Sequence, residues 1–146
     1  MIDVENKVFD TVYNAVILED PNATVISDTV EEFAKFPVVT LNEIDNSTFL
    51  KTLTRQNEEQ HAKVTYEVNV YCDNQTGHKA KCKQLFDAVD NALLGMKFTR
   101  TLVTRLPNVD RTIYRMYGRY YAIVSKAEVS EDGEGNTVNT HYLYRN

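Results

Sequence analysis

The strongest constraint on the fold is a strict alternation of side chains over residues 61–72. Every second position from Val64 to Cys72 is apolar or aromatic, and the positions between them are mostly polar. A period of two is typical of a β-strand with one buried face and one face toward water or a partner. The buried face holds Val64, Tyr66, Val68, Val70 and Cys72. The chain must therefore contain a sheet that something else covers on one side.

Residues 3–19 predict the first helix that could cover this sheet. Valines recur at every fourth position, which gives one apolar stripe along a helix. Asp3 is placed to cap the N-terminus, and Glu5 lies favourably near the positive end of the helix dipole. Pro21 ends the helix, because the residue before a proline is pushed out of helical geometry. The stripe consists of Val4, Val8, Val12 and Val16.

Residues 78–94 predict a second helix, after a turn over 73–77. Gly95 is a natural helix stop. Its apolar positions recur with helical spacing, so one face would pack on the core. These positions are Cys82, Leu85, Phe86, Val89, Ala92 and Leu93.

Four further segments predict strands. Residues 28–36, between the first two of these segments, are polar and irregular and could form one helical turn. The longest places Tyr114, Met116 and Gly118 on one face and Arg115, Tyr117 and Arg119 on the other. The predicted strands are 24–27, 38–44, 98–106 (closed by Pro107 and Asn108) and 113–126.

Residues 45–60 form a long polar stretch between two predicted strands. A connection of this length without structure of its own is unusual inside a compact domain and is often functional. We expect a long hairpin arm whose apolar residues are Phe49, Leu50 and Leu53. The candidate contact residues in this arm are Asn46, Thr48, Phe49, Leu50 and Arg55.

The sequence predicts an α+β fold in a single domain, residues 1–146. We expect one mainly antiparallel β-sheet with two α-helices packed on one face, plus the long hairpin arm. At the C-terminus, residues 127–130 and 138–144 flank the turn-rich segment 131–136, which predicts a C-terminal hairpin.

Composition excludes several classes of protein. With 42% apolar and 25% charged residues, the chain is neither disordered nor fibrous. It has no apolar run long enough for a membrane span and no leading basic-then-apolar segment, so we expect no membrane contact and no signal peptide. In such an intracellular protein Cys72 and Cys82 are expected to be free thiols. The net charge of −5 argues against a protein built mainly to grip nucleic acid.

No pattern of residues predicts catalysis or a cofactor. The chain lacks a P-loop and a nucleophile-elbow motif. The tightest metal-like grouping is Cys72, His78 and Cys82, and a structural zinc would need a fourth ligand that the neighbouring sequence does not supply. We therefore expect a protein that is not an enzyme and that has no cofactor.

Tyrosine and arginine concentrate in the last third of the chain. Six of the nine tyrosines follow residue 112, and there is no tryptophan. Tyrosine is enriched at protein interfaces but is also common in strands. A basic, aromatic sheet face and a negative arm would suit head-to-tail contact between identical subunits. The same face could bind single-stranded nucleic acid, or simply be a solvated sheet surface. The candidate interface residues here are Tyr114, Arg115, Tyr117 and Arg119.

Three stretches carry a resemblance to a known family. They are FPVVTLNEIDN at 36–46; YEVNVY at 66–71 followed by GHKAKCK at 77–83; and KFTRT at 97–101 with IYRM at 113–116 and RY at 119–120. This pattern resembles the tail terminator, or tail completion, proteins of long-tailed bacteriophages that infect Gram-positive hosts. The resemblance covers residues 1–126, and residues 127–146 look like an extension. Its motifs are packing and turn positions, such as Pro37 at a strand start, a turn at Asp45 and Asn46, and Gly77 before a helix.

The resemblance implies a structural virion protein without enzyme activity or cofactor. Members have helices packed on a sheet and assemble as a hexameric ring. That ring caps the tail tube, ends its polymerisation and docks to the head-completion or connector protein. Genomic DNA would pass through the lumen without sequence-specific contact, which an acidic total charge suits. The expected location is the tail–neck junction of the virion, after assembly in the host cytoplasm.

Two other interpretations stay open. The first is a different head–tail neck protein, a stopper or an adaptor, which would bind the portal side instead of the tube. The second is a small nucleic-acid-binding module that uses the Arg- and Tyr-rich sheet.

Overall fold

The computed structural model describes residues 1–28, 35–74, 78–107 and 110–145. Its main sheet has the strand order β1-β2-β3-β5-β4, and β8 also pairs with β5. β1 runs parallel to β2, and the other strand pairs are antiparallel, which confirms the predicted α+β fold. The helices are α1 (Glu5–Glu19) and α2 (His78–Gly95); the strands are β1 (Thr24–Ile26), β2 (Val38–Thr48), β3 (His61–Cys72), β4 (Thr99–Leu106), β5 (Tyr114–Ser125), β6 (Glu128–Glu131), β7 (Thr137–Thr140) and β8 (Leu143–Tyr144).

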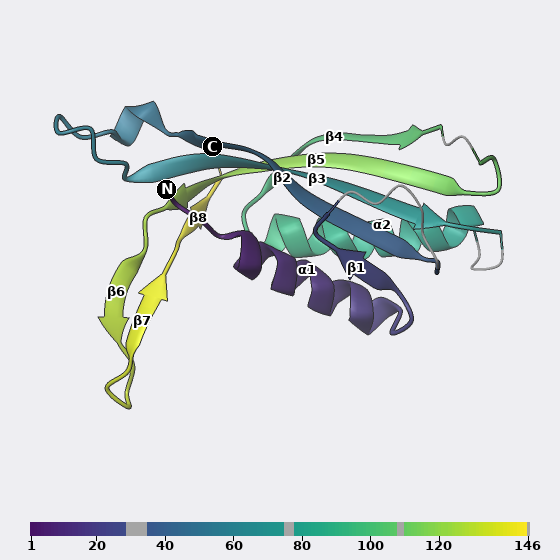
Figure 1. Cartoon of the computed structure of the whole chain (residues 1–146), viewed down its shortest axis with the longest axis horizontal. Helices are drawn as coiled ribbons and strands as arrows, with labels where there is room; N and C mark the ends of the chain where they lie inside the picture. The colour runs from purple at the N-terminus through teal and green to yellow at the C-terminus, as the bar shows by residue number, and fades with distance from the viewer. Residues whose placement is uncertain (29–34, 75–77, 108–109, 146) are drawn as a thin grey trace.

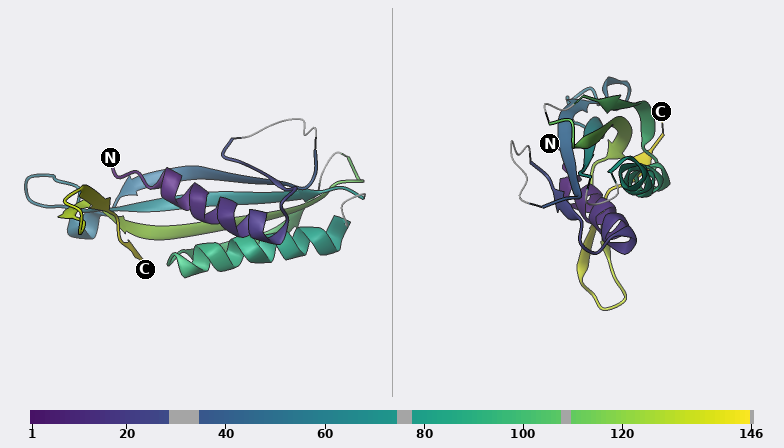
Figure 2. Two further views of the ribbon diagram at one scale, coloured as in Figure 1. Left: turned by 90° about the horizontal axis from the view of Figure 1, so that it is seen from below. Right: turned by 90° about the vertical axis from the view of Figure 1, so that its right-hand side faces the viewer.

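Both helices lie along the same side of the curled sheet (Figure 1; Figure 2). The valine stripe of α1 is buried as predicted. The predicted cap is wrong in its position: Val4 occupies the N-cap, and the Asp3 side chain accepts a hydrogen bond from the backbone N–H of Glu5 at 2.9 Å. Val4 is buried, so packing of this apolar residue sets where the helix begins.

α2 ends at Gly95 and buries the predicted apolar face, except that Asp90 is buried in place of Ala92. Ala92 is only half-buried, whereas Asp90, which sequence periodicity does not mark as a core residue, is buried. The two helices are tied together by an ion pair from Lys81 Nζ to Asp20 Oδ2 at 3.2 Å. The pair fixes the start of α2 against the end of α1.

The inner face of the sheet, which we define as the side toward the helices, forms the core. The alternating residues of β3 all belong to the buried cluster, as predicted. Gly118 on β5 lies under the ring of Phe86, and a Cβ atom there would come 2.5 Å from Phe86 Cζ. A larger residue would therefore push α2 off the sheet or displace the ring.

β2 is longer than the sequence predicts, because it continues to Thr48 through a register shift between Glu43 and Asp45. The predicted turn at Asp45 and Asn46 is therefore wrong. Both residues pair with β3 in an antiparallel ladder, opposite Thr65 and Val64. The sequence does not predict residues 45–48 as strand because their side chains are polar. The backbone hydrogen bonds to β3 form without an apolar alternation.

The C-terminal segment splits into two parts. β6 and β7 form a separate hairpin, with Glu128 opposite Thr140 and Glu131 opposite Thr137. β8 then leaves the hairpin and pairs with β5 at Val124. The prediction of one hairpin strand from Val138 to Tyr144 is thus wrong, because its end belongs to the main sheet.

Three predictions fall partly outside the described residues: the irregular segment 28–36, the turn 73–77 and the Pro107–Asn108 strand end. Within the described part of the chain, no helix is long and apolar enough to cross a bilayer.

Candidate functional site

The outer face of the sheet is the side opposite the helices. β3 and β5 supply it with aromatic and charged side chains that stand directly across from each other. Part of this face is buried: Tyr117 is only 8% exposed. The outer face consists of Lys63, Thr65, Glu67, Asn69 and Tyr71 on β3, and Arg115, Tyr117, Arg119, Tyr121 and Ile123 on β5.

A hydrogen-bonded network joins three of these side chains. The Tyr117 hydroxyl donates to Glu67 Oε2 at 3.0 Å. The Arg119 guanidinium donates to the same hydroxyl oxygen from Nε and Nη2, at 3.2 and 2.9 Å. The carboxylate thus polarises a hydroxyl that itself receives two charge-assisted bonds, which holds the three groups in one geometry.

Cations on this face also lie over aromatic rings. Arg115 donates from Nε to Asn69 Oδ1 at 2.9 Å, and its guanidinium lies 5.3 Å from the centroid of Tyr71. Lys63 Nζ lies 4.6 Å from the centroid of Tyr121. Burial raises the pKa of Tyr71. Rigid aromatic and arginine side chains with little freedom left to lose are typical of protein interfaces.

Tyr114 does not belong to this surface. It is on the inner face, 4% exposed, with its ring 5.6 Å from the ring of His78. The Arg105 guanidinium lies 4.8 Å from its centroid. The grouping of Tyr114 with Tyr117 therefore needs correction, since the two residues are three positions apart on one strand and face opposite ways.

The arm is defined here as residues 49–60, between β2 and β3. Two of the predicted contact residues form hydrogen bonds at the base of this arm and are not part of its projecting surface. Asn46 donates from Nδ2 to the carbonyl of Ile2 at 2.8 Å, and the Thr48 hydroxyl donates to Glu59 Oε1 at 3.1 Å. The contacts fix the direction in which the arm leaves the sheet.

The tip of the arm is folded and exposed. The backbone N–H of Asn57 bonds to the carbonyl of Thr54 at 2.9 Å, and the N–H of Glu58 bonds to the Thr54 hydroxyl at 3.0 Å. Arg55 is exposed at this tip, and Leu50, in the 3-10 helix near the base of the arm, is 75% exposed. Over residues 45–60, the stretch for which we expected a negative arm, the acids Asp45, Glu58 and Glu59 outnumber the bases Lys51 and Arg55 by one.

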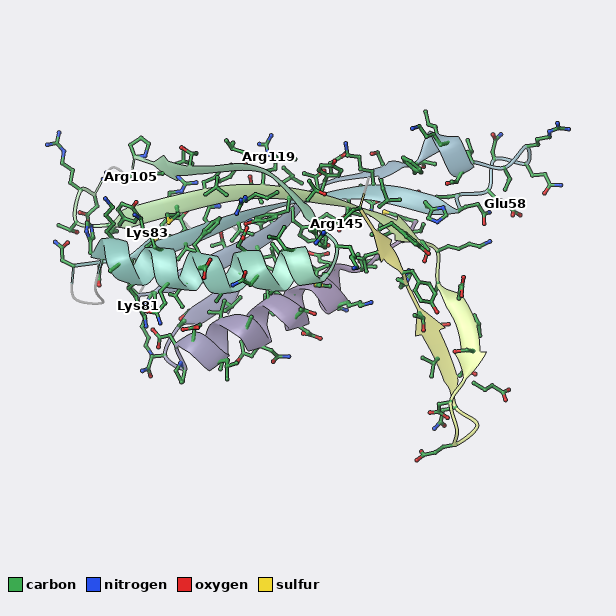
Figure 3. The ribbon with its side chains drawn as sticks, turned by 180° about the vertical axis from the view of Figure 1, so that it is seen from behind. Glu58, Lys81, Lys83, Arg105, Arg119 and Arg145 are labelled. Carbon is green, nitrogen blue, oxygen red and sulfur yellow. The ribbon has the colours of Figure 1, made fainter. Side chains whose placement is uncertain are left out.

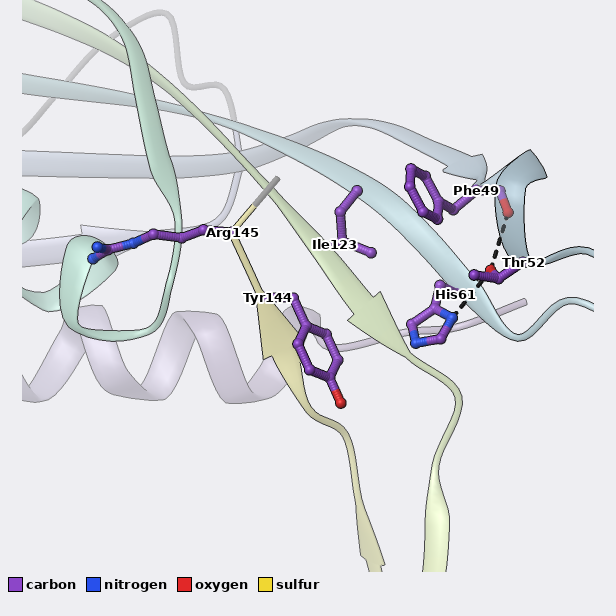
Figure 4. Close-up of a pocket in the computed structure, with 6 residues that line it drawn as sticks. All are labelled: Phe49, Thr52, His61, Ile123, Tyr144 and Arg145. Carbon is purple, nitrogen blue, oxygen red and sulfur yellow. Dashed lines mark hydrogen bonds between the residues drawn. The ribbon is translucent and has the colours of Figure 1, made fainter.

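A pocket of about 220 Å³ opens at the base of the arm (Figure 4). His61 Nδ1 lies 3.0 Å from Thr52 Oγ1, and the His61 ring meets Tyr144 edge-on at 5.8 Å. Arg145 donates from Nη2 to the carbonyl of Leu94 at 2.7 Å. Sequence reasoning missed this pocket, because its walls come from three distant segments: Phe49, Thr52 and His61; Ile123; and Tyr144 and Arg145.

The cysteines are structural. Both are buried and free, as expected, and Cys82 Sγ donates to the carbonyl of Val70 at 3.2 Å. The hydrogen bond between the thiols lowers the pKa of Cys72, whereas that bond and burial raise the pKa of Cys82. The described residues contain no group of three His, Cys, Asp or Glu side chains that could hold a metal ion.

One polar cluster reaches from the core to the surface: Asp90 and Tyr120 are buried, and the Arg100 side chain is 49% exposed. Asp90 accepts a hydrogen bond from the Tyr120 hydroxyl at 2.6 Å and bonds from Arg100 Nη1 to both carboxylate oxygens at 3.0 Å. Burial and the nearby Asp90 carboxylate raise the pKa of Tyr120. The cluster ties α2 to β4 and β5.

Comparison of the sequence with protein-family models and with curated proteins gives no match. The interpretation of these surfaces therefore depends on their geometry and on the resemblance described above.

Proposed function

We propose that this chain is a tail terminator of a long-tailed bacteriophage. It would form a ring that caps the tail tube, ends its polymerisation and joins the tail to the head connector. The observation that carries the proposal is the arm, which extends the β2–β3 ladder beyond the region that the helices cover (Figure 2). It presents the exposed side chain of Leu50 at one end of an elongated molecule.

The arrangement of surfaces supports a structural role. The helices occupy one side of the sheet and the arm projects from an end (Figure 1), whereas the aromatic and charged network lies on the other side. A protein that contacts neighbours in a ring and a tube end needs several separate surfaces of this kind.

The chain's acidic charge fits a ring that DNA must pass through. With a net charge of −5, a lumen lined by this chain would not hold phosphates. The proposed partners are other copies of the chain, the tube protein and the head-completion or connector protein.

The test is to mix purified protein with assembled tail tubes and image the tube ends. We expect a ring-shaped cap on one end with six-fold averages. An arm-replaced variant, with residues 50–60 exchanged for Asn-Gly, keeps Phe49 and His61 and closes the hairpin with a two-residue turn. This variant should fold and fail to cap tubes.

A point variant with a matched control isolates the exposed leucine near the base of the arm. Leu50→Asp should abolish capping, whereas Leu18→Asp, at another strongly exposed leucine on α1, should leave it unchanged. Normal caps with the arm-replaced variant would reject the role of the arm. Bare tube ends together with binding to connectors would assign the protein to the head side as a stopper or adaptor. Salt-sensitive binding to single-stranded DNA alone would favour the nucleic-acid alternative.

A further inference from the structure

The β6–β7 hairpin projects away from the rest of the molecule and is strongly acidic (Figure 1). Its strands are almost fully exposed, with Val129 at 72%. An isolated two-stranded hairpin is marginally stable in water, so a projecting one gains from a partner. Residues 127–144 contain no lysine or arginine and four acids: Glu128, Glu131, Asp132 and Glu134.

The acidic turn is preorganised. Asp132 Oδ1 accepts hydrogen bonds from the backbone N–H groups of Glu134 and Asn136, both at 2.9 Å. These bonds lower the pKa of Asp132, so this carboxylate stays charged. Glu131 and Glu134 stand beside this turn, and among the described residues neither carboxylate has a hydrogen bond or ion pair.

A basic pocket lies at the opposite end of the molecule, where β4 approaches β5. Its volume is about 290 Å³, and two arginines line it with three apolar residues. Arg105 lies over the Tyr114 ring, but within the described residues the N–H groups of Arg105 and Arg111 have no acidic partner. Asp110 is the acidic neighbour, and its Oδ1 accepts hydrogen bonds from the backbone N–H and the hydroxyl of Thr112. The lining residues are Arg105, Leu106, Pro107, Arg111 and Ile113.

β4 offers two further features beside this pocket. It is the last strand in the sheet order, so its outer backbone edge pairs with no described strand. Its exposed apolar residues Leu102 and Val103 could cover Val129 and Val138 of the hairpin. An unpaired edge of this kind is a template for strands of another chain.

We propose that the acidic β6–β7 hairpin of one copy docks on the basic β4–β5 end of a second copy. The two surfaces have opposite charge and lie at opposite ends of one chain, with the Arg105 end far from the hairpin (Figure 3). One molecule therefore cannot satisfy both surfaces by itself. The contact is heterologous, so repetition closes a ring or extends a filament. It deepens the proposed function by naming a subunit contact, and it depends on that function for the closed ring.

The test uses reciprocal charge reversal of the whole chain. Variant one is Glu131→Lys with Glu134→Lys, and variant two is Arg105→Glu with Arg111→Glu. The wild type should associate with increasing concentration in sedimentation experiments, and salt should weaken the association. Each variant alone should associate more than about tenfold more weakly. A mixture of the two, and the variant with all four changes, should regain association.

Matched controls place the same charge changes on the solvent side of the helices. Asp10→Lys with Asp87→Lys controls variant one, and Lys79→Glu with Lys83→Glu controls variant two. Both controls should associate like the wild type. A wild type that stays monomeric at the highest concentration, controls that fail equally, or a mixture that does not regain association would each overturn the proposal.

Capping of tail tubes is a separate measurement. If the mixture associates but tubes stay bare, the subunit contact stands and the proposed function fails. If hairpin variants associate normally but lose tube or connector binding, the hairpin binds that other protein and this inference is overturned.

Discussion

Each face of β5 carries a tyrosine that donates a hydrogen bond to a carboxylate, but we expect the two networks to have different roles. On the inner face, Tyr120 is fully buried and donates to Asp90 at 2.6 Å. On the outer face, Tyr117 donates to Glu67 at 3.0 Å while Arg119, an exposed residue, bonds to its oxygen. Both tyrosines are buried, but Asp90, the partner of Tyr120, is buried too, whereas Tyr117 bonds to the half-buried Glu67 and the exposed Arg119. A broken bond leaves unsatisfied groups in the core in the first case, and groups that water can reach in the second. The inner network should therefore control stability, and the outer one binding.

The largest effect should follow from removing the buried carboxylate. Asp90→Ala leaves the Tyr120 hydroxyl and the Arg100 guanidinium without their shared acceptor, and we expect a loss of about 3 kcal/mol in the free energy of unfolding. Denaturant titration measures it. Asp87→Ala, at an exposed position of the same helix, should change stability by less than about 0.5 kcal/mol. Equal losses in both variants would contradict the comparison.

Gly118 tests how closely α2 approaches the inner face. Gly118→Ala should cost about 2 kcal/mol, because the new methyl group meets the Phe86 ring in a packed core. Adding Phe86→Leu should recover part of this loss. Gly95→Ala is the control, since no atom beyond its chain neighbours and its own helix backbone lies within 4 Å of the position that a methyl group would take there. A neutral Gly118→Ala would show that α2 moves freely on the sheet.

The same substitution on each face gives the sharpest comparison. Tyr120→Phe should lower the free energy of unfolding by about 1.5 kcal/mol, and Tyr117→Phe by about 0.5 kcal/mol. Thermal and denaturant unfolding of both variants measure the difference. We expect Tyr117→Phe to weaken capping or self-association more than Tyr120→Phe does. Identical stability losses would show that the outer network is as structural as the inner one.

Alkaline pH probes the inner face with no mutation. Burial and the carboxylates of Glu43 and Asp90 raise the pKa values of Tyr66 and Tyr120 above 10.0 in the native state. Below pH 10 both states keep these protons. Above it the unfolded state loses them while the native state retains them, so stability should fall as pH rises. Tyr120→Phe should make the slope shallower by about 1.4 kcal/mol per pH unit. An unchanged slope would contradict the buried pairing.

Sequence periodicity predicts the parts of the fold that depend on local burial. The valines of α1 and the alternation from Val64 to Cys72 identify their buried faces, because each repeat matches the geometry of its own element. The alternation of side chains along β5 also places Tyr114 and Tyr117 on opposite faces of the sheet, although their shared residue type suggests one interface. Position in the strand thus predicts the face on which a residue lies better than residue type does.

The missed features depend on contacts between distant segments. Asp90 resembles any exposed helix carboxylate until the fold brings Tyr120 and Arg100 to it. β8 is only Leu143 and Tyr144, too short for a periodic pattern, and it exists because β5 offers an open edge there. The pocket beside the arm has the same origin. None of these could be read from a single stretch of sequence.

The closed base of the β6–β7 hairpin has a consequence for how such chains can diversify. The backbone N–H of Ser125 bonds to the carbonyl of Tyr142, and the N–H of Tyr142 bonds back to the Ser125 hydroxyl, both at 2.8 Å. The chain thus leaves the sheet and returns to it at one pair of hydrogen-bonded residues. The β6–β7 hairpin between these residues can lengthen, shorten or be exchanged while the sheet keeps its pairing, so partner choice can evolve separately from folding.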